Sequence, residues 1–118
     1  MDEYTFSGRY SSRPIHYILN SQGEPEPEDD ILRWGAWFEN DERRIVRQQR
    51  WQADNGSHFV STVFLGTDHN WFDGPPILWE TMVFIDGEDV ETQRYSSRDE
   101  AILGHNVMAV RYGGVALD

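Results

Sequence analysis

The chain has 118 residues, no cysteine, and a formal net charge of −11 from 21 acidic and 10 basic residues. This length suits one small domain with a modest core, and the lack of cysteine excludes disulfides, thiolate nucleophiles, zinc ribbons and iron–sulfur clusters. The acidic balance argues against direct nucleic-acid binding, which depends on neutralising phosphates with basic side chains. A basic partner protein fits this charge better.

The chain begins with segments that predict an arm, a strand and an acidic connector. Residues 1–13 are polar, with scattered aromatic side chains and no period, which predicts a flexible arm before a single α+β domain at 14–118. Ile15–Leu19 alternates as a short strand does. Glu24–Glu28 alternates Glu with Pro, which is incompatible with a helix interior and indicates an extended connector.

The next segment, residues 29–40, predicts a helix. Asp29 or Asp30 can serve as its N-cap, and apolar residues recur at helical spacing from Ile31 to Phe38. A strand is the competing interpretation of the same residues. The acidic residues before the segment favour the helix, because negative charge stabilises a helix N-terminus.

Four later segments have a period of two and are rich in β-branched or aromatic residues. They are Arg44–Gln52, Phe59–Gly66, Leu78–Asp86 and Val90–Tyr95. Turn-forming clusters separate them, including Asp86-Gly87, and the short links predict an antiparallel meander.

The last element predicted is a helix at 97–112. Ser97 and Glu100 form a capping-box pattern, and the helix should end near Gly113-Gly114. We expect its core-facing residues to be Ala101, Leu103, Val107 and Val110. The predicted fold is therefore α+β, with a mainly antiparallel sheet of four or five strands packed by two helices.

Residues 66–77 form a connection longer than a hairpin requires, in which acidic residues and a histidine accompany the bulky Trp71 and Phe72. With His58, the side chains of Asp68, His69 and Asp73 are candidates for a metal site or an acid/base pair. No established ligand spacing occurs among them, however. We favour a loop in which Asp and Asn make local turn hydrogen bonds and Trp71 closes one edge of the core. We predict no catalytic, cofactor or metal site.

The arginine and tryptophan contents of the chain are both unusual. All ten basic residues are arginine, which we interpret as the codon bias of a GC-rich genome. A basic stripe at Arg43, Arg44, Arg47 and Arg50 could contact phosphate, but pairing with neighbouring glutamates is the interpretation that the net charge favours. We assign four tryptophans to the core by default, namely Trp34, Trp37, Trp51 and Trp79.

Four separated blocks carry a resemblance to known proteins. They are YILNSQGEPEPEDDILRWGAWFE from Tyr17, VSTVFLGTDHN from Val60, GPPILWETMVF from Gly74 and RYSSRDEAILGH from Arg94. In this order they resemble a family of small tailed-bacteriophage and prophage proteins, over roughly residues 15–112. The resemblance implies a viral or prophage origin and no particular activity, and it transfers no catalytic residue.

We therefore expect a non-enzymatic phage accessory protein that binds a host or viral protein in the bacterial cytoplasm. No run of roughly 20 apolar residues could span a membrane, and the first residues lack the features of a secretory signal. An acidic surface can occupy a basic nucleic-acid-binding groove, so an inhibitor of a host nucleic-acid-handling or defence system is the leading hypothesis. The alternatives are a virion or assembly component and a metal-dependent enzyme that uses the 66–77 loop.

The expected partner-binding residues lie in the acidic segment and the long loop, and we expect the acidic segment to matter more. They are Glu24, Glu26, Glu28, Asp29, Asp30, Asp68, His69, Trp71, Phe72 and Asp73.

Overall fold

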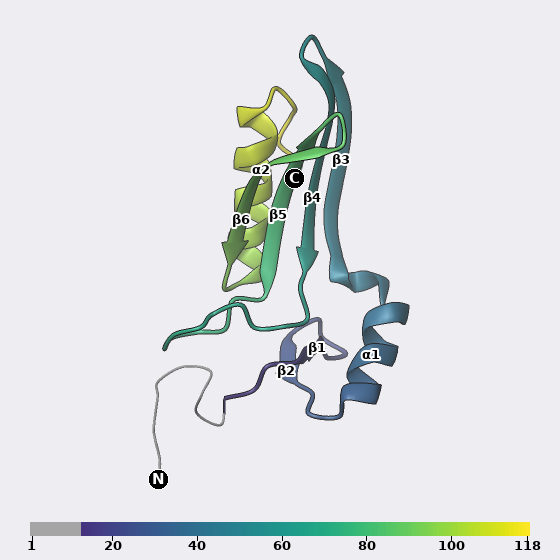
Figure 1. The fold of residues 1–118 in the computed structure, drawn as a ribbon, viewed down its shortest axis with the longest axis vertical. Coiled ribbons are helices and arrows are strands. Elements are labelled where there is room, and N and C mark those ends of the chain that lie inside the picture. The colour runs from purple at the N-terminus through teal and green to yellow at the C-terminus, as the bar shows by residue number, and fades with distance from the viewer. Residues whose placement is uncertain (1–12) are drawn as a thin grey trace. The chain divides into compact units, whose positions relative to one another are not determined.

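The computed structural model describes residues 13–118, so all of the predicted arm at 1–13 except Arg13 lies outside the described residues. The chain divides into two compact units (Figure 1). The hairpin–helix unit comprises the chain up to Arg44 together with Leu65–Leu78, and the sheet unit comprises Ile45–Phe64 and Trp79–Asp118. The elements confirm the α+β class.

The sheet unit contains the predicted antiparallel meander. Its strands lie in the order β3 to β6 and each pairs with the next. They are β3 (Ile45–Ala53), β4 (Gly56–Phe64), β5 (Trp79–Ile85) and β6 (Glu88–Tyr95). At the β5–β6 turn, Asp86 and Gly87 both have positive φ, 50° and 85°, as the right-handed twist of a two-residue hairpin requires.

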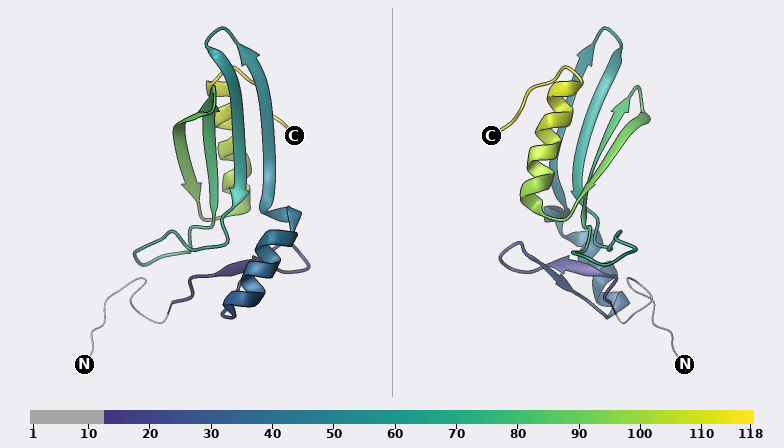
Figure 2. Two further views of the ribbon diagram at one scale, coloured as in Figure 1. Left: turned by 45° about the vertical axis from the view of Figure 1, so that its right-hand side comes forward. Right: turned by 90° about the vertical axis from the view of Figure 1, so that its left-hand side faces the viewer.

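A single helix, α2 (Arg98–Arg111), packs against one face of this sheet (Figure 2). Residues of β4 and β5 alternate between this face and the other, so Val60 and Val83 are fully buried beneath Met108. At the same face Phe64 meets Trp79 edge to face, with ring centroids 5.4 Å apart. From His58 to Phe64 in β4 and from Trp79 to Val83 in β5, every second residue is therefore buried.

The start of α2 is the capping box predicted from the sequence. Ser97 is the N-cap, and its hydroxyl oxygen accepts a hydrogen bond of 3.1 Å from the Glu100 amide. The Glu100 carboxylate in turn accepts from the amide of Ser96, one residue earlier than the usual partner. Both side chains therefore satisfy backbone donors before the first turn closes.

We expect Ser97→Ala to lower the free energy of unfolding by about 1 kcal/mol, because the Glu100 amide would lose its acceptor. Urea denaturation measures the difference, and Ser97→Asp, which can still cap the helix, is the matched control. A midpoint for Ser97→Ala equal to that of the native chain would contradict this role of the cap.

The prediction of which face of α2 is buried was wrong. Only Ala101 of the four predicted core residues is buried, and the others, Leu103, Val107 and Val110, are exposed. The buried residues of the helix are Ala101, His105, Met108 and Ala109. Apolar residues lie on both faces of α2, so their periodicity could not select the face that meets the sheet.

The hairpin–helix unit contains a two-stranded sheet and one helix. β1 (Tyr17–Leu19) pairs with β2 (Pro25–Pro27), so part of the predicted acidic connector is a strand. The helix, α1 (Ile31–Asn40), begins at Asp30, whose carboxylate accepts from two backbone amides of the first turn. The helix interpretation of this segment is thereby confirmed.

Among residues 13–118, the arginine stripe does not form the predicted ion pairs with glutamate. Arg43 and Arg44 lie in the short 3-10 helix Glu42–Arg44 that precedes β3. Arg43 binds Asp41 at 2.6 Å, and this hydrogen bond lowers the pKa of Asp41 to about 2. Arg44 instead lies over the ring of Phe38, 5.0 Å from its centroid.

Of the four tryptophans predicted for the core, only Trp79 is buried. Trp34, Trp37 and Trp51 are half-buried.

No helix within residues 13–118 is both long and apolar enough to cross a membrane.

Candidate functional site

The connection between β4 and β5, Leu65–Leu78, is an ordered loop of the hairpin–helix unit. Its two ends are joined by backbone hydrogen bonds from Leu65 to Leu78 and from His69 to Ile77. Its first turn also packs on α1. Gly66 has φ +75° and its carbonyl accepts from the Trp34 indole at 2.8 Å, and a Cβ at this position would lie 3.0 Å from the Phe38 ring.

Asp68 organises the interior of this loop. Its side chain is fully buried, and one carboxylate oxygen accepts from the amides of Asn70 and Ile77 at 2.7 and 3.0 Å. The other oxygen pairs with Arg13 at 3.1 Å. This confirms the predicted turn hydrogen bonds, and it shows that Asp68 serves as a structural acceptor.

The same contacts fix the backbone of Phe72 from both sides. Its amide donates to the Asn70 side chain at 2.9 Å, and its carbonyl accepts from the Arg13 guanidinium at 2.9 Å. Arg13 also binds the Gly74 carbonyl at 2.8 Å. The loop tip is therefore held by the nearby Asn70 side chain and by Arg13, which is 59 residues from Phe72 in the sequence.

The loop tip presents two aromatic side chains to solvent. Phe72 is 75% exposed and Trp71 is 62% exposed. The prediction that Trp71 closes an edge of the core was therefore wrong. A large apolar side chain on a backbone braced by hydrogen bonds is suited to enter a pocket on a partner, because little further ordering is required on binding.

The acidic segment divides into structural and exposed residues. The Glu28 carboxylate accepts from the Asp30 amide at 3.0 Å and lies 3.9 Å from Arg33, while Asp30 caps α1. Glu24, Glu26 and Asp29 are exposed. Only these last three can be neutralised without altering a helix start.

The candidate metal or acid/base residues are divided between the two units. His58 belongs to the sheet unit, where it is buried, stacks on Trp51 with ring centroids 5.4 Å apart, and has Nδ1 3.0 Å from the Gly56 carbonyl. Asp68, His69 and Asp73 belong to the hairpin–helix unit. Within residues 13–118, no group of three or more His, Asp or Glu side chains is placed to hold a metal ion.

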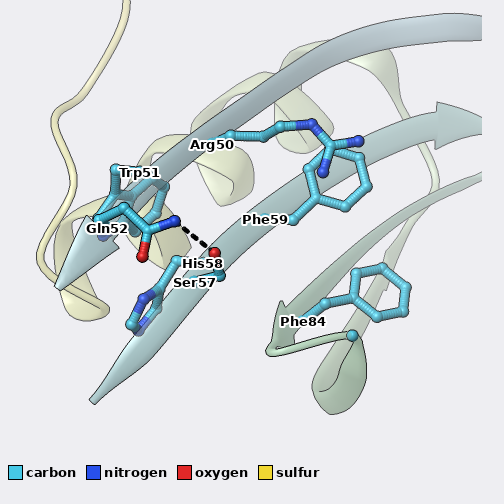
Figure 3. Close-up of a pocket in the computed structure, with 8 residues that line it drawn as sticks. Arg50, Trp51, Gln52, Ser57, His58, Phe59 and Phe84 are labelled. Atoms are coloured by element: carbon cyan, nitrogen blue, oxygen red, sulfur yellow. Dashed lines mark hydrogen bonds between the residues drawn. The ribbon is translucent and has the colours of Figure 1, made fainter. Parts of the chain in front are cut away.

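The sheet unit has a hollow of about 540 Å³ beside the tips of its hairpins (Figure 3). Arg50 lies over the Phe59 ring, 3.8 Å from its centroid, and Phe59 stacks with Phe84 at 5.8 Å. These side chains alternate with the residues packed beneath α2, so they lie on the opposite sheet face. Of the polar residues that line the hollow, Ser57 accepts a hydrogen bond from the Gln52 side chain and His58 Nδ1 lies 3.0 Å from the Gly56 carbonyl.

A series of hydrogen-bonded polar side chains crosses the core of the sheet unit. His105 Nδ1 is 2.7 Å from the Thr62 hydroxyl, which is 2.6 Å from the Thr81 hydroxyl. On the other side, His105 Nε2 is 2.6 Å from the Gln49 side-chain oxygen, which can only accept. The network therefore places a proton on Nε2, and in the neutral ring Nδ1 accepts from the Thr62 hydroxyl.

The environment of His105 keeps the ring neutral. Burial is the main cause that lowers the pKa of His105 to about 4, and the positive charge of Arg47 adds to it. Both ring nitrogens of His105 have a hydrogen-bond partner. The hydrogen-bonded side chains therefore form a structural network within the core.

Sequence reasoning missed two residues that build these features, Arg13 and His105. Arg13 lies 55 residues from Asp68, so no local pattern joins them. His105 lies on the face of α2 opposite to the predicted core face.

The chain matches no protein-family model, no curated protein and no solved structure.

Proposed function

We propose that this chain is a non-enzymatic binding protein whose hairpin–helix unit docks on another protein through the tip of the Leu65–Leu78 loop. The observation that carries the proposal is the exposed Phe72 side chain on a backbone held by Arg13 and Asn70. Aromatic anchors dominate the energetics of protein interfaces, and a braced anchor loses little entropy on binding.

The acidic excess of the hairpin–helix unit supports a basic partner. The described part of the hairpin–helix unit carries ten acidic residues and four arginines. Exposed carboxylates around an apolar anchor accelerate association with a basic surface and discriminate against acidic ones. A groove built for nucleic acid has this character, and the phage resemblance sets the interaction in an infected bacterial cell. We propose inhibition of a host nucleic-acid-handling or defence complex.

The structure gives a physical reason to rank the aromatic tip above the acidic segment. Glu28 and Asp30 are engaged in the start of α1, which leaves three exposed acids in that segment. Exposed charges contribute more to the association rate than to affinity. Trp71, which we expected to close an edge of the core, is 62% exposed and adjoins Phe72 in the sequence.

Substitution of the anchor tests this proposal. A partner is first captured with the tagged native chain from host lysate and purified, and its affinity is then measured by calorimetry. We expect Phe72→Ala to cost about 2 kcal/mol or more, which is roughly thirtyfold in Kd. Leu32→Ala is the matched control, because Leu32 is 81% exposed on α1 of the same unit. Equal losses in both variants would overturn the assignment of the loop.

The exposed acids give a separate prediction. Replacing Glu24 and Glu26 by Gln and Asp29 by Asn should slow association with a basic partner roughly tenfold at low salt, with little change in dissociation. Stability should change by less than about 0.5 kcal/mol, since these side chains are exposed.

The control for this prediction is a sheet-unit variant with the same change in net charge, made at the exposed Asp54, Glu88 and Asp89. Stopped-flow association at several salt concentrations distinguishes the two variants. Equal slowing in both would show that net charge acts without regard to position.

A further inference from the structure

Arg50 carries an unpaired positive charge on the sheet face that α2 does not cover. Its guanidinium lies over the Phe59 ring, 3.8 Å from the centroid, and makes no hydrogen bond or ion pair with any residue of 13–118. By contrast, Arg94 of the same unit binds Glu80 at 2.9 Å. A guanidinium has five N–H donors in a planar fork. The donors of Arg50 are therefore available to an anion, although the chain has an excess of carboxylates.

Two phenylalanine rings form an aromatic surface beside this guanidinium (Figure 3). Phe59 on β4 stacks with Phe84 on β5, with ring centroids 5.8 Å apart and planes inclined by 23°. Both side chains are half-buried. The ring of a ligand can extend such a stack, because offset-parallel aromatic pairs attract each other. The sheet unit therefore places an aromatic surface next to an unpaired cation.

The hollow at these residues has the size of a small-molecule site. Its volume of about 540 Å³ lies within the range of roughly 300–1,000 Å³ that is usual for ligand pockets. Gln52 and Ser57 also line it, and their side chains are already bonded to each other. None of the residues of 13–118 that line the hollow is acidic. Arg50 therefore supplies the charge that a ligand in the hollow would meet.

Carboxylates near the hollow limit the charge that a ligand can carry. The Asp86 carboxylate accepts from the Ser57 amide at 2.9 Å. Asp54, Glu88 and Asp89 are exposed at or beside the turns of the two hairpins. These groups repel a phosphate dianion or a nucleic-acid strand more strongly than they repel a carboxylate, which has a single negative charge. A carboxylate can also accept two parallel hydrogen bonds from one guanidinium.

We propose that this hollow binds a small aromatic carboxylate, with the ligand's ring on Phe84 and its carboxylate at the Arg50 guanidinium. Arg50 lies opposite Phe59, and Phe59 lies opposite Phe84, so the three side chains form one row across the sheet. One planar ligand can therefore reach both the cation and the second ring. With one charged contact on an exposed side chain, binding should be weak, with a Kd near 1 mM.

Chemical-shift titration of the ¹⁵N-labelled native chain with 2-naphthoate tests the site. We expect saturable shifts of the Phe59 and Phe84 amides and of the Arg50 side-chain Nε–H. Two probes separate the ring from the charge: 2-naphthalenemethanol keeps the ring without the charge, and cyclohexanecarboxylate keeps the charge without the ring. Each should bind at least roughly fivefold more weakly than 2-naphthoate.

Two variants test the role of the cation. Arg50→Gln should raise the Kd of 2-naphthoate roughly tenfold and leave that of 2-naphthalenemethanol unchanged. Arg98→Gln is the matched control, because Arg98 is also exposed but lies in the first turn of α2. Phe84→Leu, which removes the aromatic surface, should weaken both naphthalene probes. The dispersion of each variant's spectrum checks that it is folded.

Three results would overturn the proposal. The first is the absence of saturable shifts up to about 20 mM 2-naphthoate. The second is an equal loss of 2-naphthoate binding in Arg50→Gln and Arg98→Gln, which would show that the net charge acts without regard to position. The third is tighter binding of adenosine monophosphate than of 2-naphthoate, which would assign the hollow to a nucleotide instead.

Discussion

Lowering the pH from 8 to 5 is expected to reduce the free energy of unfolding of the sheet unit by about 2 kcal/mol, through His105 alone. The pKa of His105 in the folded chain is about 4, because the ring is buried beside Arg47, whereas an unfolded histidine has a pKa of about 6.5. The unfolded state therefore binds a proton first as pH falls. The stability is complete above about pH 6.5, and about 3 kcal/mol is lost by pH 4.

Urea denaturation at a series of pH values, followed by circular dichroism, measures this loss. His105→Gln retains a hydrogen-bonding side chain but cannot titrate, so its stability should be lower throughout and lack the His105 contribution between pH 7 and 5. The difference between the two chains isolates that contribution. A native chain with the same pH dependence as the variant would show that His105 is not held neutral.

The second large effect is expected at Asp68. Asp68→Ala should destabilise the hairpin–helix unit by about 3 kcal/mol, because it leaves the Arg13 guanidinium without its buried carboxylate and two backbone amides without an acceptor. The Asp68→Asn control keeps an acceptor oxygen but removes the charge, so it should cost less.

Amide hydrogen exchange at Asn70 and Ile77 reports this change locally. Both amides donate to the Asp68 carboxylate, so their protection should fall in Asp68→Ala and be largely retained in Asp68→Asn. Unchanged protection in the alanine variant would contradict the organising role of Asp68. If the loop tip is the binding site, the alanine variant should also lose affinity for the partner.

Local chemistry explains why much of the fold could be predicted. The strands of the meander show a period of two, the Asp86-Gly87 pair determines a tight turn, and Ser97 with Glu100 determines a helix start. β2 was not predicted as a strand, because its Glu and Pro residues have poor strand propensity. Pairing with β1 determines its conformation.

The orientation of α2 required information that the sequence pattern lacks. Leu103, Val107 and Val110 form one apolar stripe, and Ala101, His105, Met108 and Ala109 form the other. A period of 3.6 fits both stripes. The smaller residues and the histidine face the sheet. His105 finds partners there in Thr62 and Gln49, which lie far away in the sequence.

The sequence pointed to the 66–77 loop as a candidate site, but it did not predict the long-range contacts that hold the loop in place. The length and composition of the 66–77 loop identified it as a functional candidate, and Asp68 was expected to make turn hydrogen bonds. The backbone at Phe72 and Gly74 is held by long-range contacts of Arg13, which periodicity does not report. Whether the loop binds a partner stays a prediction.

Site-directed photo-cross-linking tests the central claim most directly. A benzophenone amino acid replaces Phe72 in one chain and Leu32 in another, and both chains are irradiated with the captured partner at equal concentration. Our account predicts a covalent adduct from position 72 and little or none from position 32, since both side chains are exposed but only the first lies on the braced loop tip. An adduct from position 32 with none from position 72 would contradict it.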